Sequence, residues 1–258
     1  MTFIDTHTHL YLDAFDEDRA ETFKRANTAG VKYMLLPNID SGSIANMDET
    51  CRSFPDQCFP MMGLHPGSVK ENYKKELEVI KTALEPKRHI AIGEIGMDLY
   101  WDKTFRQQQE EVFRTQIGWA IEHNLPIVIH ARDSFDEIYQ VVSEMNCDEL
   151  KGVFHCFTGT QEQAEKMLSL GGFKLGIGGV LTFKNASLDK VVKDIDTEHL
   201  ILETDSPYLA PAPYRGKRNE SSNIPLIAEK LASAKNLSVN EVAQQTTKNA
   251  IELFKLPV

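Results

Sequence analysis

Histidine and acidic residues recur in short clusters along the chain, each directly after a run of apolar residues. The first cluster is Asp5-Thr-His7-Thr-His9, in which two histidines stand two residues apart. Residues i and i+2 of an extended strand point to the same side, so both imidazoles could bind one metal ion. The later clusters add four further candidate ligands, Glu94, His130, His155 and Asp205, and another cluster contains His65.

These residue types favour a catalytic metal centre over a structural one. Structural zinc is usually held by cysteines in a closed tetrahedral site, and the four cysteines of this chain form no CxxC pair. Histidine and carboxylate ligands are typical of open catalytic sites. The number of candidates favours two divalent ions, which in hydrolases lie about 3.5–4 Å apart. Many metal-dependent amidohydrolases bridge their two ions with a modified lysine, but no lysine stands at the expected strand ends of this chain. Glu94 is therefore the candidate bridge.

Short apolar runs after turn signals predict the strands that must position these side chains. We expect eight strands, near residues 2–6, 31–36, 59–64, 89–94, 126–131, 151–156, 173–177 and 199–204. Several runs are apolar almost throughout, as in parallel strands that are buried on both faces. Helical patterns lie between most of them, including a helix expected over residues 106–123.

Helix boundaries carry signals of their own. Four stretches fit the S/T-x-x-E/Q capping box, and they begin at Thr104, Ser134, Thr160 and Ser238. Gly30 and Gly171 are expected to end the helices before them. These signals support a regular alternation of strand and helix.

Alternating strands and helices predict an α/β fold, a (β/α)8 TIM-type barrel in a single domain that spans residues 1–258. A doubly wound open sheet is the alternative, although no GxGxxG follows the first expected strand. Active sites of such barrels lie at the C-terminal ends of the strands, where five of the eight histidines fall. We interpret His89, His123 and His199, which fall elsewhere, as structural.

Composition and charge exclude several classes of protein. With 41% hydrophobic and 26% charged residues, the chain is not expected to be disordered. The mean hydropathy is −0.33, and no run approaches the roughly 18 apolar residues of a membrane span. No secretory signal is visible, and the cysteine usage favours a reducing cytoplasm. We expect no membrane partner and no obligate protein partner.

Several segments together resemble the TatD family of metal-dependent deoxyribonucleases. They are Thr-His-Thr-His-Leu at 6–10, Gly-Leu-His-Pro at 63–66, Gly-Glu-Ile-Gly at 93–96, His-Ala-Arg-Asp at 130–133, Phe-His-Cys-Phe at 154–157 and Glu-Thr-Asp-Ser-Pro-Tyr-Leu at 203–209. Residues 214–220 are similar to the family's segment after the eighth strand. The likeness runs in order from residue 5 to about residue 255. It implies a TIM-type barrel that cuts DNA, commonly from the 3′ end, with divalent metal.

The resemblance also implies a role for each candidate residue. It assigns His7, His9 and Asp205 to a first metal ion. It assigns His130 and His155 to a second ion, with Glu94 as the bridge. Three residues are expected at the substrate phosphate, namely His65, Arg132 and Arg215. Leu99 stands after Asp98 where family members often carry a tyrosine, so the surface that faces the nucleotide can differ.

The expected mechanism is attack by a metal-activated water on phosphorus. Asp205 is the candidate that accepts or relays the proton. Glu203 should share its face, and it either orients Asp205 or the substrate, or accepts a supporting hydrogen bond. Cys156 should point away from the site, because its neighbour His155 points inward.

The charge pattern bears on the substrate. The net charge of −10 argues against broad capture of nucleic acid, whereas Arg215, Lys217 and Arg218 form a local basic cluster or a solvated loop. We therefore expect DNA strand ends as substrate, with 3′–5′ exonuclease action on single strands and Mg, Mn or Zn as the two ions. The alternative is hydrolysis of small amides, lactones or phosphotriesters on the same barrel, which the fold alone does not separate.

Overall fold

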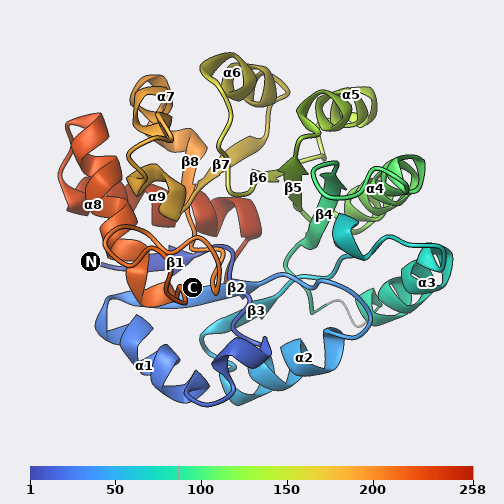
Figure 1. Ribbon diagram of the computed structural model, residues 1–258, viewed down its shortest axis with the longest axis horizontal. Coiled ribbons are helices and arrows are strands. Elements are labelled where there is room, and N and C mark those ends of the chain that lie inside the picture. The colour runs from blue at the N-terminus through green and yellow to red at the C-terminus, as the bar shows by residue number, and fades with distance from the viewer. Residues whose placement is uncertain (86–87, 258) are drawn as a thin grey trace.

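The computed structural model describes residues 1–85 and 88–257, in which eight strands alternate with helices along the chain (Figure 1). The strands are β1 (Phe3–Asp5), β2 (Val31–Leu36), β3 (Cys58–Pro60), β4 (Ile92–Asp98), β5 (Ile127–Arg132), β6 (Gly152–Phe154), β7 (Phe173–Ile177) and β8 (Leu200–Leu202). Each overlaps one of the eight expected ranges. The largest differences are at β3, which ends at Pro60, four residues before the expected end, and at β4, which continues to Asp98, four residues beyond it.

The strands form a closed parallel barrel. Strands β1 to β3 pair in one sheet and β4 to β8 in a second. An isolated bridge between Met62 and Ile92 joins the β3 end of the first sheet to β4. On the other side, the amide of Thr6 donates to the carbonyl of Leu202 at 3.1 Å, which joins β1 to β8. The predicted (β/α)8 barrel is confirmed, and the open doubly wound sheet is excluded.

Helices surround the strands in Figure 1. They are α1 (Arg19–Thr28), α2 (Ile44–Ser53), α3 (Tyr73–Leu84), α4 (Arg106–His123), α5 (Phe135–Met145), α6 (Gln161–Ser169), α7 (Leu188–Asp194), α8 (Ile224–Lys235) and α9 (Val239–Phe254). Helix α9 lies behind β1 and β8 in Figure 1 and packs against both. Asn249 of α9 donates to the carbonyls of Thr197 and Leu200, so this helix covers the end of the barrel where the strands begin.

An apolar layer fills the barrel interior next to α9. Its members come from or directly beside seven of the strands: Ile4, Leu35, Met61, Ala91, Val128, Val153 and Ile201. Successive inward side chains of a strand are two residues apart. Two residues after Val128 and Val153 stand His130 and His155, so the interior changes from apolar to polar towards the C-terminal ends of the strands.

Two of the four predicted capping boxes form in the structure, and two do not. The capping boxes at Thr160 and Ser238 are confirmed, and Gly30 and Gly171 take the positive φ of a helix end. The Ser134 hydroxyl instead donates to the carbonyl of Met97 at 2.6 Å. At Thr104 the prediction was also wrong, because α4 begins at Arg106 with Phe105 as its N-cap residue.

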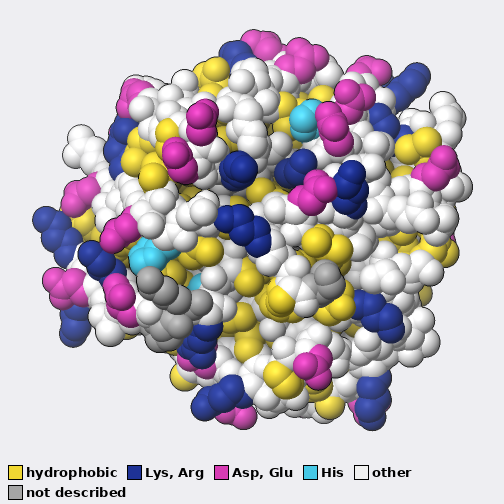
Figure 2. All heavy atoms as spheres, turned by 180° about the vertical axis from the view of Figure 1, so that it is seen from behind, with side chains coloured by type: hydrophobic (Ala, Val, Ile, Leu, Met, Phe, Trp, Pro, Cys, Tyr) yellow, Lys and Arg dark blue, Asp and Glu magenta, His cyan; other side chains and the backbone are white. Residues whose placement is uncertain are grey.

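Charges of both signs are mixed on the face opposite that of Figure 1. Figure 2 shows lysine and arginine side chains among aspartate and glutamate side chains around its rim, with hydrophobic side chains towards the middle. Among the helices that the structure describes, none combines the length and the apolar character needed to cross a membrane.

Candidate metal centre

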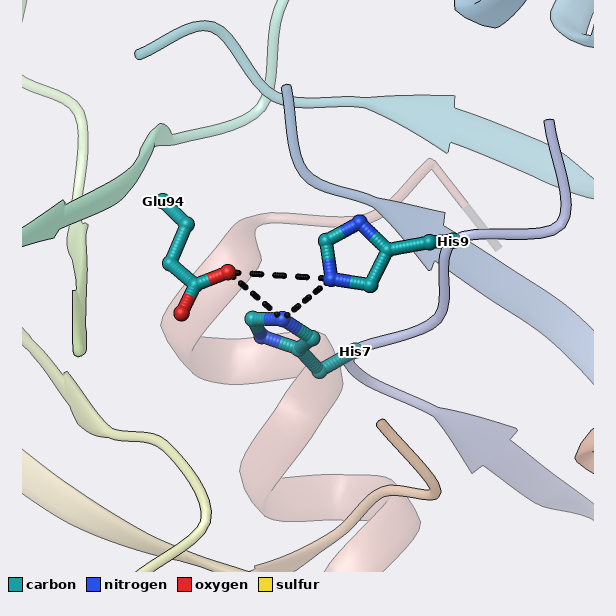
Figure 3. Close-up of side chains that lie close together, drawn as sticks. All are labelled: His7, His9 and Glu94. Atoms are coloured by element: carbon teal, nitrogen blue, oxygen red, sulfur yellow. Dashed lines mark hydrogen bonds and ion pairs between the residues drawn. The ribbon is translucent and has the colours of Figure 1, made fainter. Parts of the chain in front are cut away.

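Glu94 of β4 lies at the centre of a buried cluster of histidines. Its Oε2 atom is 3.2 Å from Nε2 of His7 and 3.7 Å from Nε2 of His9. The two Nε2 atoms are 3.3 Å apart. Figure 3 shows both imidazoles, which follow β1, turned towards the Glu94 carboxylate. The i, i+2 spacing therefore brings the two histidines to one point, as the sequence predicts.

Asp205 joins the same side of the cluster. Its Oδ1 atom lies 3.7 Å from Nε2 of His7 and 3.6 Å from Nε2 of His9. The chain after β8 is held against the chain after β1, because the Asp205 amide donates to the His7 carbonyl at 2.9 Å and the His9 amide donates to the Ser206 carbonyl at 2.8 Å. This pairing presents the Asp205 carboxylate to both imidazoles.

The second oxygen of Glu94 serves a second set of histidines. Oε1 is 2.8 Å from Nδ1 of His130 and 2.8 Å from Nε2 of His155. The two carboxylate oxygens thus contact different sets, which is the arrangement that a bridging ligand requires. The predicted ligands of both ions converge on Glu94.

His65 lies closer to the centre than the phosphate role implies. Its Nε2 atom is 3.5 Å from Oε1 of Glu94 and 3.3 Å from Nδ1 of His130. These three residues are one of the groups whose donor atoms are close enough together to hold an ion. The structure therefore places His65 beside the second set of histidines, where it could bind either an ion or the substrate.

Two further carboxylates contact the ring nitrogens of His155 and His130 that do not face Glu94. Oε1 of Glu203 is 3.4 Å from Nδ1 of His155, and Oδ2 of Asp98 is 3.1 Å from Nε2 of His130. Carboxylates in such positions fix the orientation of an imidazole ligand. The position of Glu203 fits a supporting acceptor for His155. The sequence analysis missed this role of Asp98, although a second acidic residue at the end of the same strand as Glu94 was the available signal.

The pKa values of the candidate ligands are shifted in both directions. Burial opposes a charged His130 and a charged His155, but the nearby carboxylates raise the pKa of both. Burial lowers the pKa of His7 and of His65, which favours the neutral imidazole that a metal needs. Burial alone would raise the pKa of Glu94, but the surrounding histidines, His155 foremost, hold it well below its usual value. A buried, ionised carboxylate between imidazoles fits divalent ions better than it fits an apolar ligand.

The two predicted phosphate arginines lie outside this cluster. The Arg132 guanidinium stands over the ring of Tyr100, 3.9 Å from its centroid. The Arg215 guanidinium stands over the ring of Phe183 at 3.8 Å. Both side chains are exposed, so both remain open to a ligand.

One other sequence-based interpretation was wrong. Arg218 does not belong to a free basic cluster, because its Nη1 atom pairs with Oδ1 of Asp18 at 2.7 Å. Burial raises the pKa of the Cys156 thiol, and the charges of Asp205 and Glu203 raise it further. Strand β6 ends at Phe154, and Cys156 has a φ of 45°, so the alternation of a strand no longer applies there.

Comparison with known proteins identifies similar sequences and structures. A family described as TatD related DNase matches residues 4–255. The uncharacterized metal-dependent hydrolase YabD of Bacillus subtilis is 38% identical over 253 residues, 98% of each chain. A protein of Pantoea ananatis named 3′-5′ ssDNA/RNA exonuclease TatD is 31% identical, over 98% of this chain and 99% of that protein. The crystal structure of the TatD homologue YjjV of Escherichia coli superposes with a TM-score of 0.93 at 29% identity, over 99% of this chain and 98% of that one.

Proposed function

The chain belongs to the TatD related DNase family of metal-dependent hydrolases, and we propose that it releases nucleotides from the 3′ end of single-stranded DNA. One observation carries the proposal, namely the division of the Glu94 carboxylate between two sets of histidines. Two divalent ions on such a bridge are a recurrent device for phosphodiester hydrolysis. The name of the Pantoea ananatis relative supports the polarity and the single-stranded substrate.

The residues present fit two ions. His7, His9 and Asp205 would hold one ion with Oε2 of Glu94, and His130 and His155 would hold the other with Oε1. Bound there, divalent ions would supply an activated water and offset the charge of the phosphoryl oxygens. A set of four imidazoles favours Zn²⁺ or another transition ion over Mg²⁺.

The protein's own residues then position the reaction. The Asp205 side chain is 15% exposed, more than those of His7 and His9 beside it. Burial alone would raise the pKa of Asp205, but a hydrogen bond from His9 and the charge of His155 lower it. The carboxylate is therefore ionised and can accept a proton from water. Arg132 and Arg215, which are exposed, can contact the phosphates of the strand.

The test is a panel of substrates offered to the purified protein. It contains a single-stranded DNA labelled at either end, a covalently closed single-stranded circle, RNA, duplex DNA and an aryl ester, each with Mg, Mn or Zn. We expect mononucleotides from the 3′ end of the linear single strand and little cleavage of the circle. Cleavage of the circle as fast as the linear strand would contradict exonuclease action. Hydrolysis of the ester alone would contradict the substrate class.

A further inference from the structure

Large hydrophobic side chains are exposed mainly around the mouth of the metal centre. Five of the seven exposed ones in the described residues follow β4 or β8: Tyr100, Trp101, Tyr208, Leu209 and Tyr214. Trp101 has the most exposed side chain of the seven, at 77%. Exposed aromatic side chains grouped at one place on a surface usually mark a binding site. Because four of these five side chains are aromatic, we expect a ligand with flat, apolar surfaces.

Tyr100, Trp101 and Arg132 form one unit on the β4 side of the mouth. The rings of Tyr100 and Trp101 meet edge to face, with 4.7 Å between their centroids. The Arg132 guanidinium lies 3.9 Å from the Tyr100 centroid and 5.3 Å from that of Trp101. We call these three residues the stacking platform. It combines flat apolar surface with one positive charge.

The platform is tied directly to the metal centre through Asp98. Oδ1 of Asp98 accepts a hydrogen bond of 3.0 Å from the Tyr100 amide, while Oδ2 lies 3.1 Å from Nε2 of His130. Asp98 also faces Arg132 in the parallel register of β4 and β5. One carboxylate thus fixes both a candidate metal ligand and the start of the platform. A ligand on the platform would lie beside the reacting group.

We propose that the stacking platform binds a nucleobase of the substrate strand, next to the phosphodiester that is cut. This inference rests on the proposed function and names the part of the substrate that the enzyme recognises. Stacking on aromatic rings accepts every base, because every base has a flat face. A base in a duplex is already stacked and paired, so the platform favours single strands. Arg132 can at the same time contact the adjacent phosphate.

Tryptophan fluorescence can test the contact without any turnover. The chain has two tryptophans, and Trp119 of α4 is buried, 7% exposed. A base stacked on Trp101 should quench its emission. The ligand is a four-residue thymidine oligonucleotide with phosphorothioate linkages, which resists hydrolysis, in the presence of Mn²⁺. We expect saturable quenching in the wild type and in Trp119→Phe, and its loss in Trp101→Phe.

Affinity measurements separate stacking from a general effect on the fold. With a dye-labelled oligonucleotide, Trp101→Ala should weaken binding about 5- to 150-fold, the range expected for one stacked base. Trp101→Phe keeps a ring and should stay within about threefold of the wild type. Val79→Ala, which trims an exposed side chain on α3, is the matched control and should bind normally.

An oligonucleotide without bases provides the decisive comparison. Removing the bases should weaken binding to the wild type about 5- to 150-fold and should make little difference to Trp101→Ala. If removal of the bases weakened binding equally in the wild type and in Trp101→Ala, the proposed role of the stacking platform would be wrong. The exposed aromatic side chains would then suit a protein partner instead. That result is distinct from failure of the proposed function, in which the wild type would cleave no nucleic acid at all.

Discussion

Glu203 and His155 form a buried pair in which Oε1 of the carboxylate lies 3.4 Å from Nδ1 of the imidazole. This contact leaves Nε2 of His155 directed at Glu94, at 2.8 Å. Oε1 of Glu203 also accepts a hydrogen bond of 2.5 Å from the Cys156 amide, which fixes the carboxylate itself. Burial opposes a charged His155, but the carboxylates of Glu94 and Glu203 raise its pKa well above the usual value. Glu203 is therefore placed to hold a proton on Nδ1 of His155 and to leave Nε2 for an ion.

Replacement of Glu203 by glutamine tests this positioning role. The amide keeps the size of the side chain but can donate to Nδ1, which favours the wrong tautomer of His155. We expect metal affinity, measured by calorimetric titration, to fall about 10- to 100-fold, with an unchanged far-ultraviolet circular dichroism spectrum. Glu162→Gln, at an exposed position on α6, is the control. Wild-type metal affinity in Glu203→Gln would show that the pair has no such role.

The absence of a side chain at Gly176 of β7 leaves the space that Glu203 occupies. A Cβ atom at Gly176 would collide with Oε2 of Glu203. We therefore expect Gly176→Ala to displace Glu203 and to weaken metal binding much as Glu203→Gln does. Gly118→Ala is the matched control, because a Cβ there meets nothing within 4 Å and should stabilise α4 by about 0.5–1 kcal/mol. Equal metal affinity in the two alanine variants would contradict the steric argument.

The positions of the candidate ligands could be predicted because the barrel obeys simple rules. Apolar runs mark strands that are buried on both faces, and parallel strands bring their C-terminal ends to one rim. His130 follows the inward-facing Val128 of β5 by two residues, so strand alternation turns it into the interior. His155 stands directly after β6, two residues after the inward-facing Val153, and it keeps the same direction. The resemblance to the TatD family, now confirmed, added the roles but not the positions.

Other features depend on contacts that no local pattern contains. The partner of Arg218 is Asp18, 200 residues earlier in the sequence, and the basic cluster was misread for that reason. Alternation also fails once a strand has ended. Cys156 and Asp205 both have positive φ values beyond the last residues of β6 and β8, so their directions follow from turns and not from the strand period.

His89, which lies between α3 and β4, should make the protein less stable in acid. Burial lowers the pKa of His89 to about 4, and the charge of Arg88 adds to the effect. Between pH 6.5 and 4 the unfolded chain therefore binds a proton that the folded chain does not, and the free energy of unfolding falls as the pH falls. The expected contribution is about 3 kcal/mol over this range. Urea denaturation of the wild type and of His89→Leu at several pH values measures it.

Carboxylates also titrate in acid, but they do so in both proteins. The difference in the loss of unfolding free energy between the wild type and His89→Leu therefore measures the contribution of His89. His89→Leu should lose less stability between pH 6.5 and 4 than the wild type does. Both ring nitrogens of His89 are buried without a hydrogen-bond partner in the described structure, so leucine removes no bond. Parallel stability curves for the two proteins would show that His89 does not titrate in this way.

Removal of metal should abolish hydrolysis and lower the thermal stability. The histidines and carboxylates of the centre bind ions only in the folded state, so an ion at 100 times its dissociation constant adds about 2.7 kcal/mol to the free energy of unfolding. We expect a chelator to lower the melting temperature and eliminate activity, and added Mn or Zn to restore both. Full activity in excess chelator would exclude the metal mechanism.

The decisive variant for the two-ion arrangement is Glu94→Gln. Glutamine keeps the size of the side chain, but it loses the charge and replaces one oxygen with an NH₂ group that cannot bind a cation. One of the two histidine sets therefore loses its shared ligand, either His7 with His9 or His130 with His155. We expect one metal equivalent fewer per chain, or weaker binding of both, and activity lower by at least about 10- to 100-fold.

The fold of Glu94→Gln should survive, because the apolar layer beside α9 lies at the opposite end of the barrel from the carboxylate. Circular dichroism and thermal unfolding of the metal-free protein check this. Metal content measured by atomic emission, beside Glu162→Gln as the control, then separates the loss of an ion from the loss of structure. Two ions per chain and near-normal activity in Glu94→Gln would mean that another group joins the two sets of histidines.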